Sequence, residues 1–402
     1  MLNIKMDMIQ TVGLAVVILI IGRFLRKKVK FFETYCIPSP VIGGFLFAII
    51  NLFLRQMNLI IFEFDNTLQS FFMTLFFTSI GFNASWRLLK IGGRKVIMFL
   101  IVSIILVILQ NILAVGIGYA TGVDPLIALL TGSTAMTGGH GTAAAMAPIV
   151  EELGHNGAKS VAIAAATFGL IAGSSLGGPP ANRLIKGRKL EVVAEEVDNQ
   201  QVRNDEFLFN NDVKKLDGES FAKAFFMILL AMFIGSYVST FLNHFLKFPS
   251  YIGPMIVAAI LRNISDHTTK FDLHYEEVHI LEDVSLNLFL GMAMISLKLW
   301  ELSNVAGQLA ILLLAQAVLA WIFIYFVTFK FMGGNYDAAV LSAGHTGFGL
   351  GATPNGIANM QSVCDKYKHS HIAFFVMPIV GALFIDFFNV AIISGFFSFL
   401  SR

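Results

Sequence analysis

The fold of this chain is decided by one glycine-rich stretch, Thr137-Gly138-Gly139-His140-Gly141-Thr142, which interrupts an otherwise apolar segment. A second glycine-rich stretch, 344–355, interrupts the other half of the chain at the matching place. Backbone that is not helical inside a bilayer must be buried in protein or line a water-filled cavity. Interruptions paired in this way are the best indication in a sequence of a transporter's binding site.

The composition of the chain is that of a membrane protein. Of its 402 residues, 56% are hydrophobic and 13% are charged, whereas a soluble domain carries about 25% charged residues. We therefore expect membrane lipid around most of the chain. The net charge of +2 implies no attraction to nucleic acid, so we expect no nucleic-acid partner. The sequence contains no nucleotide-binding loop, nucleophile–base pair or zinc-ligand spacing, and an enzyme is therefore not expected.

Ten apolar segments are predicted as membrane spans, because a spanning helix needs about 20 mostly apolar residues. They lie near 8–25, 38–54, 67–86, 96–121, 157–185, 221–246, 249–263, 281–297, 306–330 and 371–399. The two broken segments, 125–152 and 336–362, each divide at their glycines into pieces of about 13 residues, or ~20 Å. Neither piece can cross an apolar core of ~30 Å. Each segment is therefore a re-entrant hairpin or a broken helix that crosses.

Basic residues decide how the first broken segment, 125–152, is arranged. Cytoplasmic loops are enriched in Lys and Arg. Basic clusters follow the first, third and fifth spans, at 23–30, 87–95 and 183–189. All three lie on the cytoplasmic side only if 125–152 dips into the membrane and returns, so we expect a re-entrant hairpin there. Both termini then lie outside, and the polar linker 187–220 is cytoplasmic.

The two halves of the chain resemble each other. Pro38-Ser39-Pro40 is similar to Pro249-Ser250-Tyr251, and the broken segment 336–362 matches the first one. Each half has five spans, an odd number, so the second half must enter the membrane upside down, as in many secondary transporters. The predicted fold class is therefore an all-α polytopic membrane protein. It has two inverted repeats of five transmembrane helices, 1–186 and 221–402, each with a re-entrant helical hairpin.

The half-helix ends at the two breaks are candidate ligand sites. The first N–H groups of a helix lack partners and form its positive end, which suits a carboxylate. Free carbonyls at a half-helix end suit a cation. Thr142, Thr353 and Asn355 follow the breaks, where they can cap the next half-helix, coordinate Na⁺ or bind substrate. The predicted substrate-binding residues are Gly138, Gly139, His140, Gly141, Thr142, Gly351, Ala352, Thr353 and Asn355.

Polar residues also lie within the last span. Asp386 is near its middle, where a carboxylate costs several kcal/mol unless it is paired or hydrated. Asn389 lies three residues further on, on the same helix face. Together they can supply cation ligands, or they can form a polar clasp between helices. His140, inside the first break, is either a functional residue or a packing histidine.

Four other polar residues are predicted to have structural roles. Asp124 and Asp337 open the two broken segments, and both are predicted as helix N-caps. Gln110 and Gln316 lie inside the fourth spans of the two halves. We expect them to form hydrogen bonds between helices.

Several stretches together resemble one known family over nearly the whole chain. They are 137–142, 166–170, 298–302, 335–341, 344–354 and 356–361. They resemble the bacterial sodium/glutamate symporter family. The resemblance implies a carrier that takes up L-glutamate together with Na⁺ across the bacterial cytoplasmic membrane. It also implies inverted five-span halves, a homodimer, and a transport domain that moves against a scaffold in an elevator-type alternating-access movement.

This resemblance suggests roles for the residues at the breaks. The two hairpin tips are expected to meet near the membrane midplane, with the half-helix N-termini holding glutamate. The predicted Na⁺ ligands are Thr137, Gly349, Asp386 and Asn389. A carrier for another dicarboxylate, a proton-coupled carrier and a passive channel are the alternatives.

Overall fold

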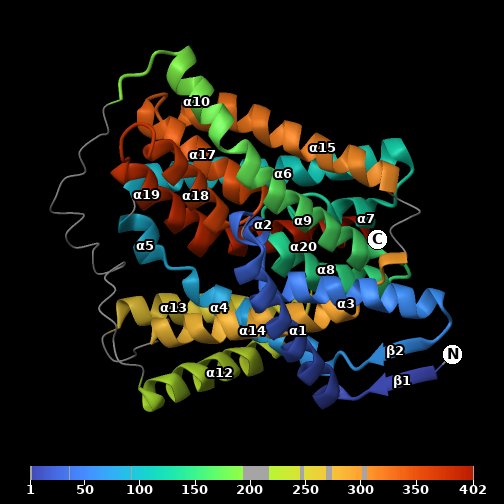
Figure 1. The fold of residues 1–402 in the computed structure, drawn as a ribbon. Helices are drawn as coiled ribbons and strands as arrows, with labels where there is room; N and C mark the ends of the chain where they lie inside the picture. The colour runs from blue at the N-terminus through green and yellow to red at the C-terminus, as the bar shows by residue number, and fades with distance from the viewer. Residues whose placement is uncertain are drawn as a thin grey trace.

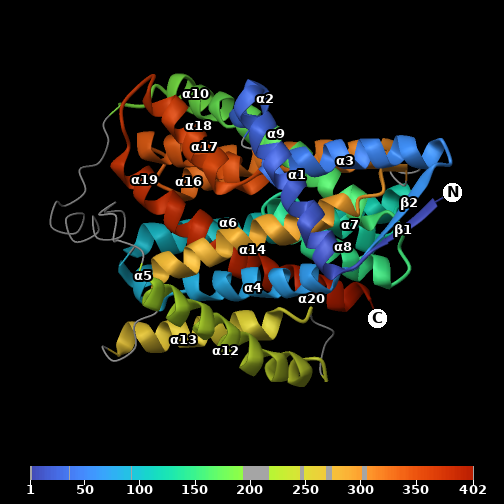
Figure 2. The same cartoon turned by 60° about the horizontal axis from the view of Figure 1, so that its bottom comes forward.

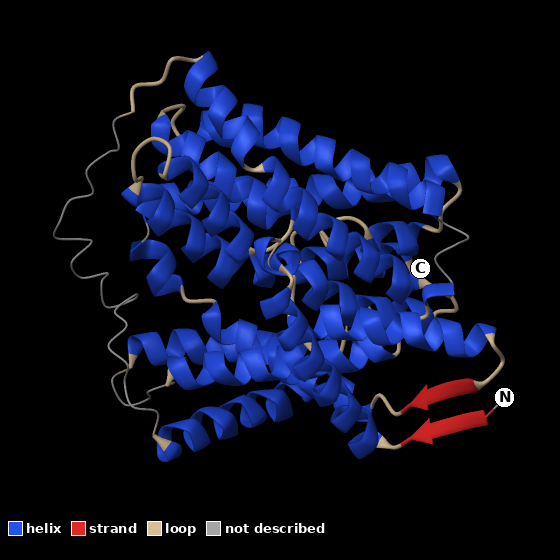
Figure 3. Cartoon of the chain, in the orientation of Figure 1, coloured by secondary structure: helices blue, strands red, loops and turns tan. Residues whose placement is uncertain are grey.

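The computed structural model describes residues 2–35, 37–91, 93–192, 217–244, 249–268, 274–300 and 306–401. Most of these residues are helical, as Figure 3 shows. Eight described helices are long and apolar enough to cross a membrane. The expectation of a helical polytopic membrane protein is therefore confirmed. Most of the predicted linker, 193–216, lies outside the described residues.

The membrane-length helices agree with eight of the ten predicted spans. They are α1 (Met8–Lys28), α3 (Ser39–Gln56), α6 (Gly93–Thr121), α9 (Ala158–Leu176) continued by α10 (Gly178–Gly187), α12 (Gly218–Leu242), α14 (Tyr275–Ile295), α15 (Ala306–Phe323) continued through the π-helical η2 (Ile324–Thr328) into α16 (Phe329–Phe331), and α19 (His371–Pro378) continued through the π-helical η3 (Ile379–Phe384) into α20 (Ile385–Leu400). The other two predicted spans form α4 (Thr67–Asn83) and α13 (Ile252–His267), which are shorter, with 17 and 16 residues.

Two short strands were not anticipated by the all-α prediction. β1 (Leu2–Met6) pairs in parallel with β2 (Ile60–Phe64), with Leu2 opposite Ile60. Lys5 and Asn3 on β1 both bond the Glu63 carboxylate on β2, at 3.2 and 2.7 Å. Both segments lie next to apolar spans and are only five residues long, and only β1 alternates apolar with polar residues, so the signal for a strand is weak.

The helices form two bundles, which Figure 1 shows one below the other. The lower bundle consists of α1, α3, α4, α12, α13 and α14. The upper bundle consists of α6 to α10 and α15 to α20, including α7 (Pro125–Leu130), α8 (Gly139–Glu152), α17 (Tyr336–Leu350) and α18 (Thr353–Cys364). Figure 2 shows α12 and α13 outermost in the lower bundle. Each bundle therefore combines segments from both halves of the chain.

Small residues bring helix backbones of the upper bundle close together. A Cβ atom placed on Gly169 of α9 would lie 2.2 Å from the Leu350 carbonyl oxygen of α17. Such close approach is how helices pack where lipid provides no hydrophobic driving force. All fifteen residues of α17 are buried, including the polar Asp337 and His345. The end of α17 is thereby held firmly in the centre of the upper bundle.

Candidate functional site

The first glycine-rich break separates α7 from α8. Residues 131–138 between them form successive turns. The Asp124 side chain caps α7 by accepting a hydrogen bond from the Leu126 amide at 2.9 Å, so its predicted role as an N-cap is confirmed. Gly139, the first residue of α8, has a φ of +58°. This left-handed conformation is costly for any residue with a Cβ atom and explains a glycine there.

The second break separates α17 from α18 at Gly351 and Ala352. The prediction that Asp337 caps α17 is wrong. The cap is Asn335, whose side chain accepts a hydrogen bond from the Ala338 amide at 3.0 Å. Asp337 lies within the first turn instead and accepts a hydrogen bond from the Ser370 hydroxyl at 2.5 Å. The helix begins earlier than expected because Asn335 is itself a favourable cap.

The two breaks are in contact with each other. A Cβ atom on Gly139 would lie 3.2 Å from the Gly351 carbonyl oxygen. Between them is a cavity of about 200 Å³. Its lining includes nine residues predicted from the sequence: Thr137, Gly138, Gly139, His140, Gly141, Gly351, Ala352, Thr353 and Asp386. Apolar side chains that sequence reasoning did not select complete much of the wall, among them Phe76, Leu170, Leu286 and Phe348.

Four predicted residues do not line this cavity: Thr142, Gly349, Asn355 and Asn389. Thr142 is buried behind Gly138. The Asn355 amide nitrogen donates to the Leu170 carbonyl oxygen at 3.0 Å. These residues therefore support the breaks from behind.

The N-termini of α8 and α18 both open onto the cavity. Their N-cap residues, Gly138 and Ala352, line it and make no side-chain capping hydrogen bond. The capping alternative for Thr142 and Thr353 is therefore wrong, and the Thr353 hydroxyl donates instead to the Gly381 carbonyl oxygen at 2.6 Å. At the start of α8 the leading amides are left to a ligand. At the start of α18, Pro354 has no N–H and the Asn355 amide donates to the Ala352 carbonyl oxygen at 3.0 Å, so the Thr353 amide is the one left. Each helix N-terminus favours a negatively charged group.

Two titratable side chains line the cavity among the described residues, His140 and Asp386. The His140 Nε2 atom lies 3.0 Å from the Thr167 hydroxyl, which donates its own proton to the Ile163 carbonyl oxygen. Because that hydroxyl has one proton, this arrangement places a proton on His140 Nε2 and leaves Nδ1 as an acceptor. An anion in the cavity would then be bound by helix amides, and Asp386 is the carboxylate in the same lining.

One amide joins the two breaks. Gln110 of α6 donates from Nε2 to the Gly349 carbonyl oxygen at 2.7 Å and accepts at Oε1 from the Thr137 hydroxyl at 2.9 Å. Gln316 of α15 donates to the Gln110 carbonyl oxygen at 2.8 Å. The predicted helix–helix bonds are therefore present. Sequence reasoning missed that Gln110 also ties both breaks together, because only the fold brings Thr137 and Gly349 to it.

A second polar network lies behind the first break. Asn111 Oδ1 accepts hydrogen bonds from the Ser133 amide at 2.9 Å and from its hydroxyl at 3.0 Å. The Asn389 amide nitrogen donates to the Ser133 carbonyl oxygen at 3.2 Å. Asp386 and Asn389, expected to act together, therefore face different surroundings. Asp386 lines the cavity, and Asn389 contacts the turn behind it.

Two helix breaks that meet at a cavity inside a polytopic helical bundle are the arrangement of a membrane transport protein. The family model described as sodium/glutamate symporter matches residues 4–369. The chain is 38% identical over 393 residues to a sodium/glutamate symporter of Haemophilus influenzae, covering 97% of this chain and 96% of that one. It is also 38% identical over 390 residues to the Escherichia coli protein of the same name, covering 96% of each. The chain belongs to the sodium/glutamate symporter family and is a transporter rather than an enzyme.

Replacing Gly139 by alanine is expected to destabilise the protein. Alanine would have to keep the left-handed backbone conformation of Gly139, and its Cβ would approach the Gly351 carbonyl oxygen. The expected cost is about 1–3 kcal/mol. Gly141→Ala is the matched control, because its Cβ would meet Leu286 and Phe76 at an ordinary 3.4 Å. The unfolding midpoints of the purified proteins in detergent measure the difference. Equal midpoints for the two variants would contradict the assigned contact between the breaks.

Gln110→Met is expected to weaken substrate binding as well as stability. It removes the amide that bonds both the Gly349 carbonyl and the Thr137 hydroxyl and leaves only the long hydrogen bond of 3.4 Å between those two groups. A buried group left without a good partner costs about 1–3 kcal/mol. Gln316→Met removes a bond from the same network but touches neither break, so it should lower stability alone. Ligand affinity and unfolding midpoint, measured on both variants, separate the two effects. An unchanged affinity in Gln110→Met would show that this amide does not position the breaks.

Proposed function

We propose that this protein carries out sodium-coupled uptake of L-glutamate across the bacterial cytoplasmic membrane. The observation that carries the proposal is the cavity between the two breaks, which offers two helix N-termini and one carboxylate, Asp386. Glutamate has two carboxylates and one ammonium group. Each of its charged groups thus finds one complementary partner, with the N-termini of α8 and α18 taking the carboxylates.

Asp386 is assigned to the ammonium group of the substrate. The sequence suggested this residue as a Na⁺ ligand, but its place in the same lining as both helix N-termini favours direct contact with the substrate. His140 Nδ1, left as an acceptor by the bond to Thr167, can receive a further ammonium proton. The apolar wall formed by Phe76, Leu286 and Phe348 excludes water and strengthens these interactions.

The charge balance of the loaded cavity supports coupling to a cation. Glutamate carries one net negative charge, and an ionised Asp386 adds another. The two helix N-termini offset roughly half a charge each. The remaining negative charge would oppose movement through an apolar environment. Of the other Na⁺ ligands predicted from the sequence, Asn389 lies beside the first break and can help to hold the compensating ion. The Thr137 hydroxyl and the Gly349 carbonyl are both bonded to Gln110 instead.

Alternating access is proposed to occur by an elevator-type movement of the upper bundle against the lower one. Support comes from the two bundles of Figure 1, each drawn from both halves of the chain. The site lies in the upper bundle except for residues such as Phe76, Leu286 and Leu290, which the lower bundle contributes to the cavity wall. A sliding interface at this wall would open the cavity to one side at a time. The homodimer proposed with it would form through the lower bundle, since the upper one must move.

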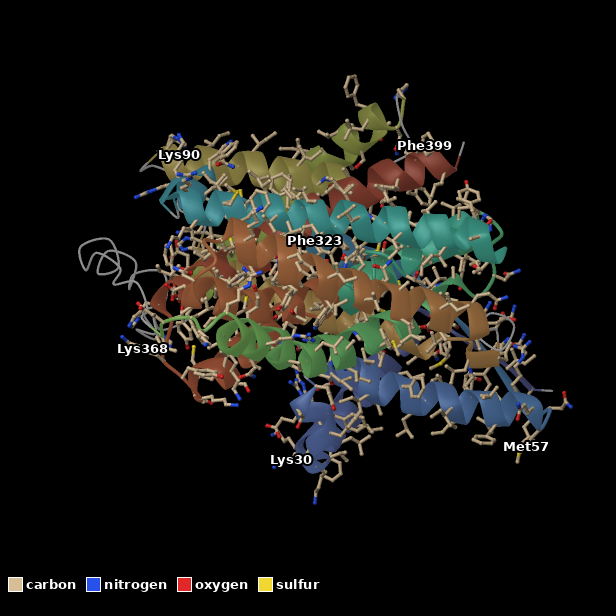
Figure 4. The ribbon with its side chains drawn as sticks, turned by 90° about the horizontal axis from the view of Figure 1, so that it is seen from above. Lys30, Met57, Lys90, Phe323, Lys368 and Phe399 are labelled. Atoms are coloured by element: carbon tan, nitrogen blue, oxygen red, sulfur yellow. The ribbon has the colours of Figure 1, made fainter. Side chains whose placement is uncertain are left out.

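The proposed topology has two inverted repeats, 1–186 and 221–402, with re-entrant hairpins at 125–152 and 336–362. In support, neither α7 nor α8 (6 and 14 residues) and neither α17 nor α18 (15 and 12 residues) can span ~30 Å alone. Figure 4 shows Lys90 and Lys368 at one end of the bundles and Met57 and Phe399 at the other, with Lys30 between the two ends. We assign the end with Lys90 and Lys368, and the linker 187–220, to the cytoplasm. The two chain termini lie at the opposite end.

Uptake of radiolabelled glutamate into proteoliposomes tests the coupling. We expect accumulation only with an inward Na⁺ gradient, and faster uptake of glutamate than of aspartate or other dicarboxylates. Equal uptake with choline in place of Na⁺ would overturn the coupling, and dependence on a proton gradient would favour the proton-coupled alternative. Downhill flux without trans-inhibition would indicate a passive channel.

Asp386→Asn is expected to change which ligand is preferred. Losing one member of a buried charge pair costs about 3–5 kcal/mol, so the KM for glutamate should rise by at least tenfold. Glutarate lacks the ammonium group, and its inhibition of uptake should become stronger relative to glutamate. Asp365→Asn, at an exposed position, is the control and should leave both unchanged. If Asp386→Asn weakened the binding of glutamate and of glutarate equally, Asp386 would not contact the ammonium group.

A further inference from the structure

A cluster of buried polar side chains, the polar compartment, lies behind the first break and does not line the cavity. It is formed by Asn111 of α6, by Ser133 and Thr134 of the turn 131–138, and by Asn389 of α20. None of these four residues has measurable exposure, and none lines the substrate cavity. Buried polar groups of this kind are normally all hydrogen-bonded.

Two oxygen atoms in this compartment have no hydrogen-bond partner among the described residues. They are Asn389 Oδ1 and Thr134 Oγ1. The orientation of the Asn389 amide is set by its nitrogen, which donates to the Ser133 carbonyl oxygen at 3.2 Å. Flipping this amide would place two acceptors against each other. Both unpaired oxygens therefore belong to the folded arrangement, at a cost of about 1–3 kcal/mol each unless a ligand meets them.

The unpaired Thr134 hydroxyl differs from its neighbours in the same turn. Thr131 donates to the Ala128 carbonyl oxygen at 2.8 Å, Ser133 donates to Asn111, and Thr137 donates to Gln110. Of the four hydroxyl side chains between 131 and 138, Thr134 alone lacks a partner. Thr134 directly follows Ser133, to which Asn389 is bonded, so both unpaired oxygens belong to residues on or bonded to the same part of the turn.

The chemistry of the compartment suits a small hard cation. Its available atoms are a hydroxyl and an amide oxygen, and hard cations prefer oxygen ligands. The turn follows the C-terminal end of α7, where the helix dipole is negative. Unwound carbonyls and half-helix C-termini are the groups that hold Na⁺ in secondary transporters. Asn111 Nδ2 is also unpaired, but it is a donor and is not a ligand.

We propose that Na⁺ binds in this compartment, ligated by Asn389 Oδ1, Thr134 Oγ1 and backbone carbonyls of the turn 131–138. The proposal rests on the proposed sodium coupling and gives it a location outside the substrate cavity. Asn111 is a positioning residue, because its two bonds to Ser133 fix the turn. The ion and the substrate then occupy separate compartments on opposite sides of the first break.

The position of this site explains how the ion and the substrate are coupled. The Ser133 carbonyl oxygen accepts both the Asn389 amide and the Gly138 amide, at 3.2 and 2.8 Å. A cation that holds Asn389 to the turn thus also orders Gly138, the N-cap of α8. It fixes α20 as well, where Asp386 lies one turn before Asn389. Both partners of glutamate are positioned by the ion, and by linkage glutamate must strengthen Na⁺ binding equally.

The test measures Na⁺ binding without transport. Purified protein in detergent is titrated with NaCl against choline chloride at constant ionic strength, and the rise in unfolding midpoint gives the apparent Na⁺ affinity. We expect wild-type protein to be stabilised by Na⁺ and further by glutamate. Thr134→Val and Asn389→Ala should raise the half-saturating Na⁺ concentration by roughly tenfold or more. Thr134→Ser retains the hydroxyl and should retain the wild-type value.

Two further variants guard against simple misfolding. Asn389→Asp keeps the side-chain size and adds a charge, so it should lower the half-saturating Na⁺ concentration. Asn359→Ala is the matched control, because this buried asparagine of the upper bundle donates to Gly173 and Ala343 instead. It should lower the unfolding midpoint without altering Na⁺ affinity.

The measurements distinguish a wrong Na⁺ site from a wrong assignment of sodium coupling. Wild-type Na⁺ affinity in both Thr134→Val and Asn389→Ala, with wild-type protein still stabilised by Na⁺, would overturn the site and leave sodium coupling in place. The same result would mean that Asn389 Oδ1 and Thr134 Oγ1 are hydrogen-bonded only by water. If wild-type protein showed no stabilisation by Na⁺ and no Na⁺-dependent uptake, sodium coupling itself would be wrong.

Discussion

Backbone groups that leave a helix inside an apolar bundle must still find partners, and this requirement organises the centre of the protein. The turn 131–138 and the Gly351-Ala352 link are held by groups from helices distant in sequence. Gln110 bonds to both breaks, Asn111 and Asn389 bond to Ser133, and Asn355 bonds to Leu170. Unpaired groups at this depth would each cost several kcal/mol. The breaks are therefore stable only when both halves of the chain are packed together.

This requirement also produces the ligand cavity. Glycine at position 139 allows a left-handed turn that directs the start of α8 toward the second break. The N-terminus of α18 reaches the same space from the other break. An anionic ligand there meets the leading amides of α8 and the Thr353 amide of α18, with no Lys or Arg among the described lining residues.

Sequence reasoning located the breaks well because polar residues and clustered glycines are costly within an apolar segment unless they serve a ligand or a close helix contact. It selected nine residues of the cavity lining, and it recognised Asp124 as a cap. It was wrong about Asp337, because Asn335 lies two residues earlier and caps equally well. It missed β1 and β2, since five residues give too short a pattern beside long apolar spans. Ser133 and Thr134 gave no signal, because small hydroxyl residues are common in such turns.

The sequence by itself determined that this is a polytopic helical membrane protein with two glycine-rich breaks and a carboxylate inside its last span. These conclusions depend on composition and local chemistry, which need no knowledge of what packs against what. Only the tertiary structure decided which polar residues share a compartment. Asp386 and Asn389 lie one turn apart on the same helix, yet one lines the cavity and the other contacts Ser133. The physical reason is that helix packing and the geometry of the breaks decide which residues become neighbours in a membrane bundle. The spacing of residues along the chain does not specify either.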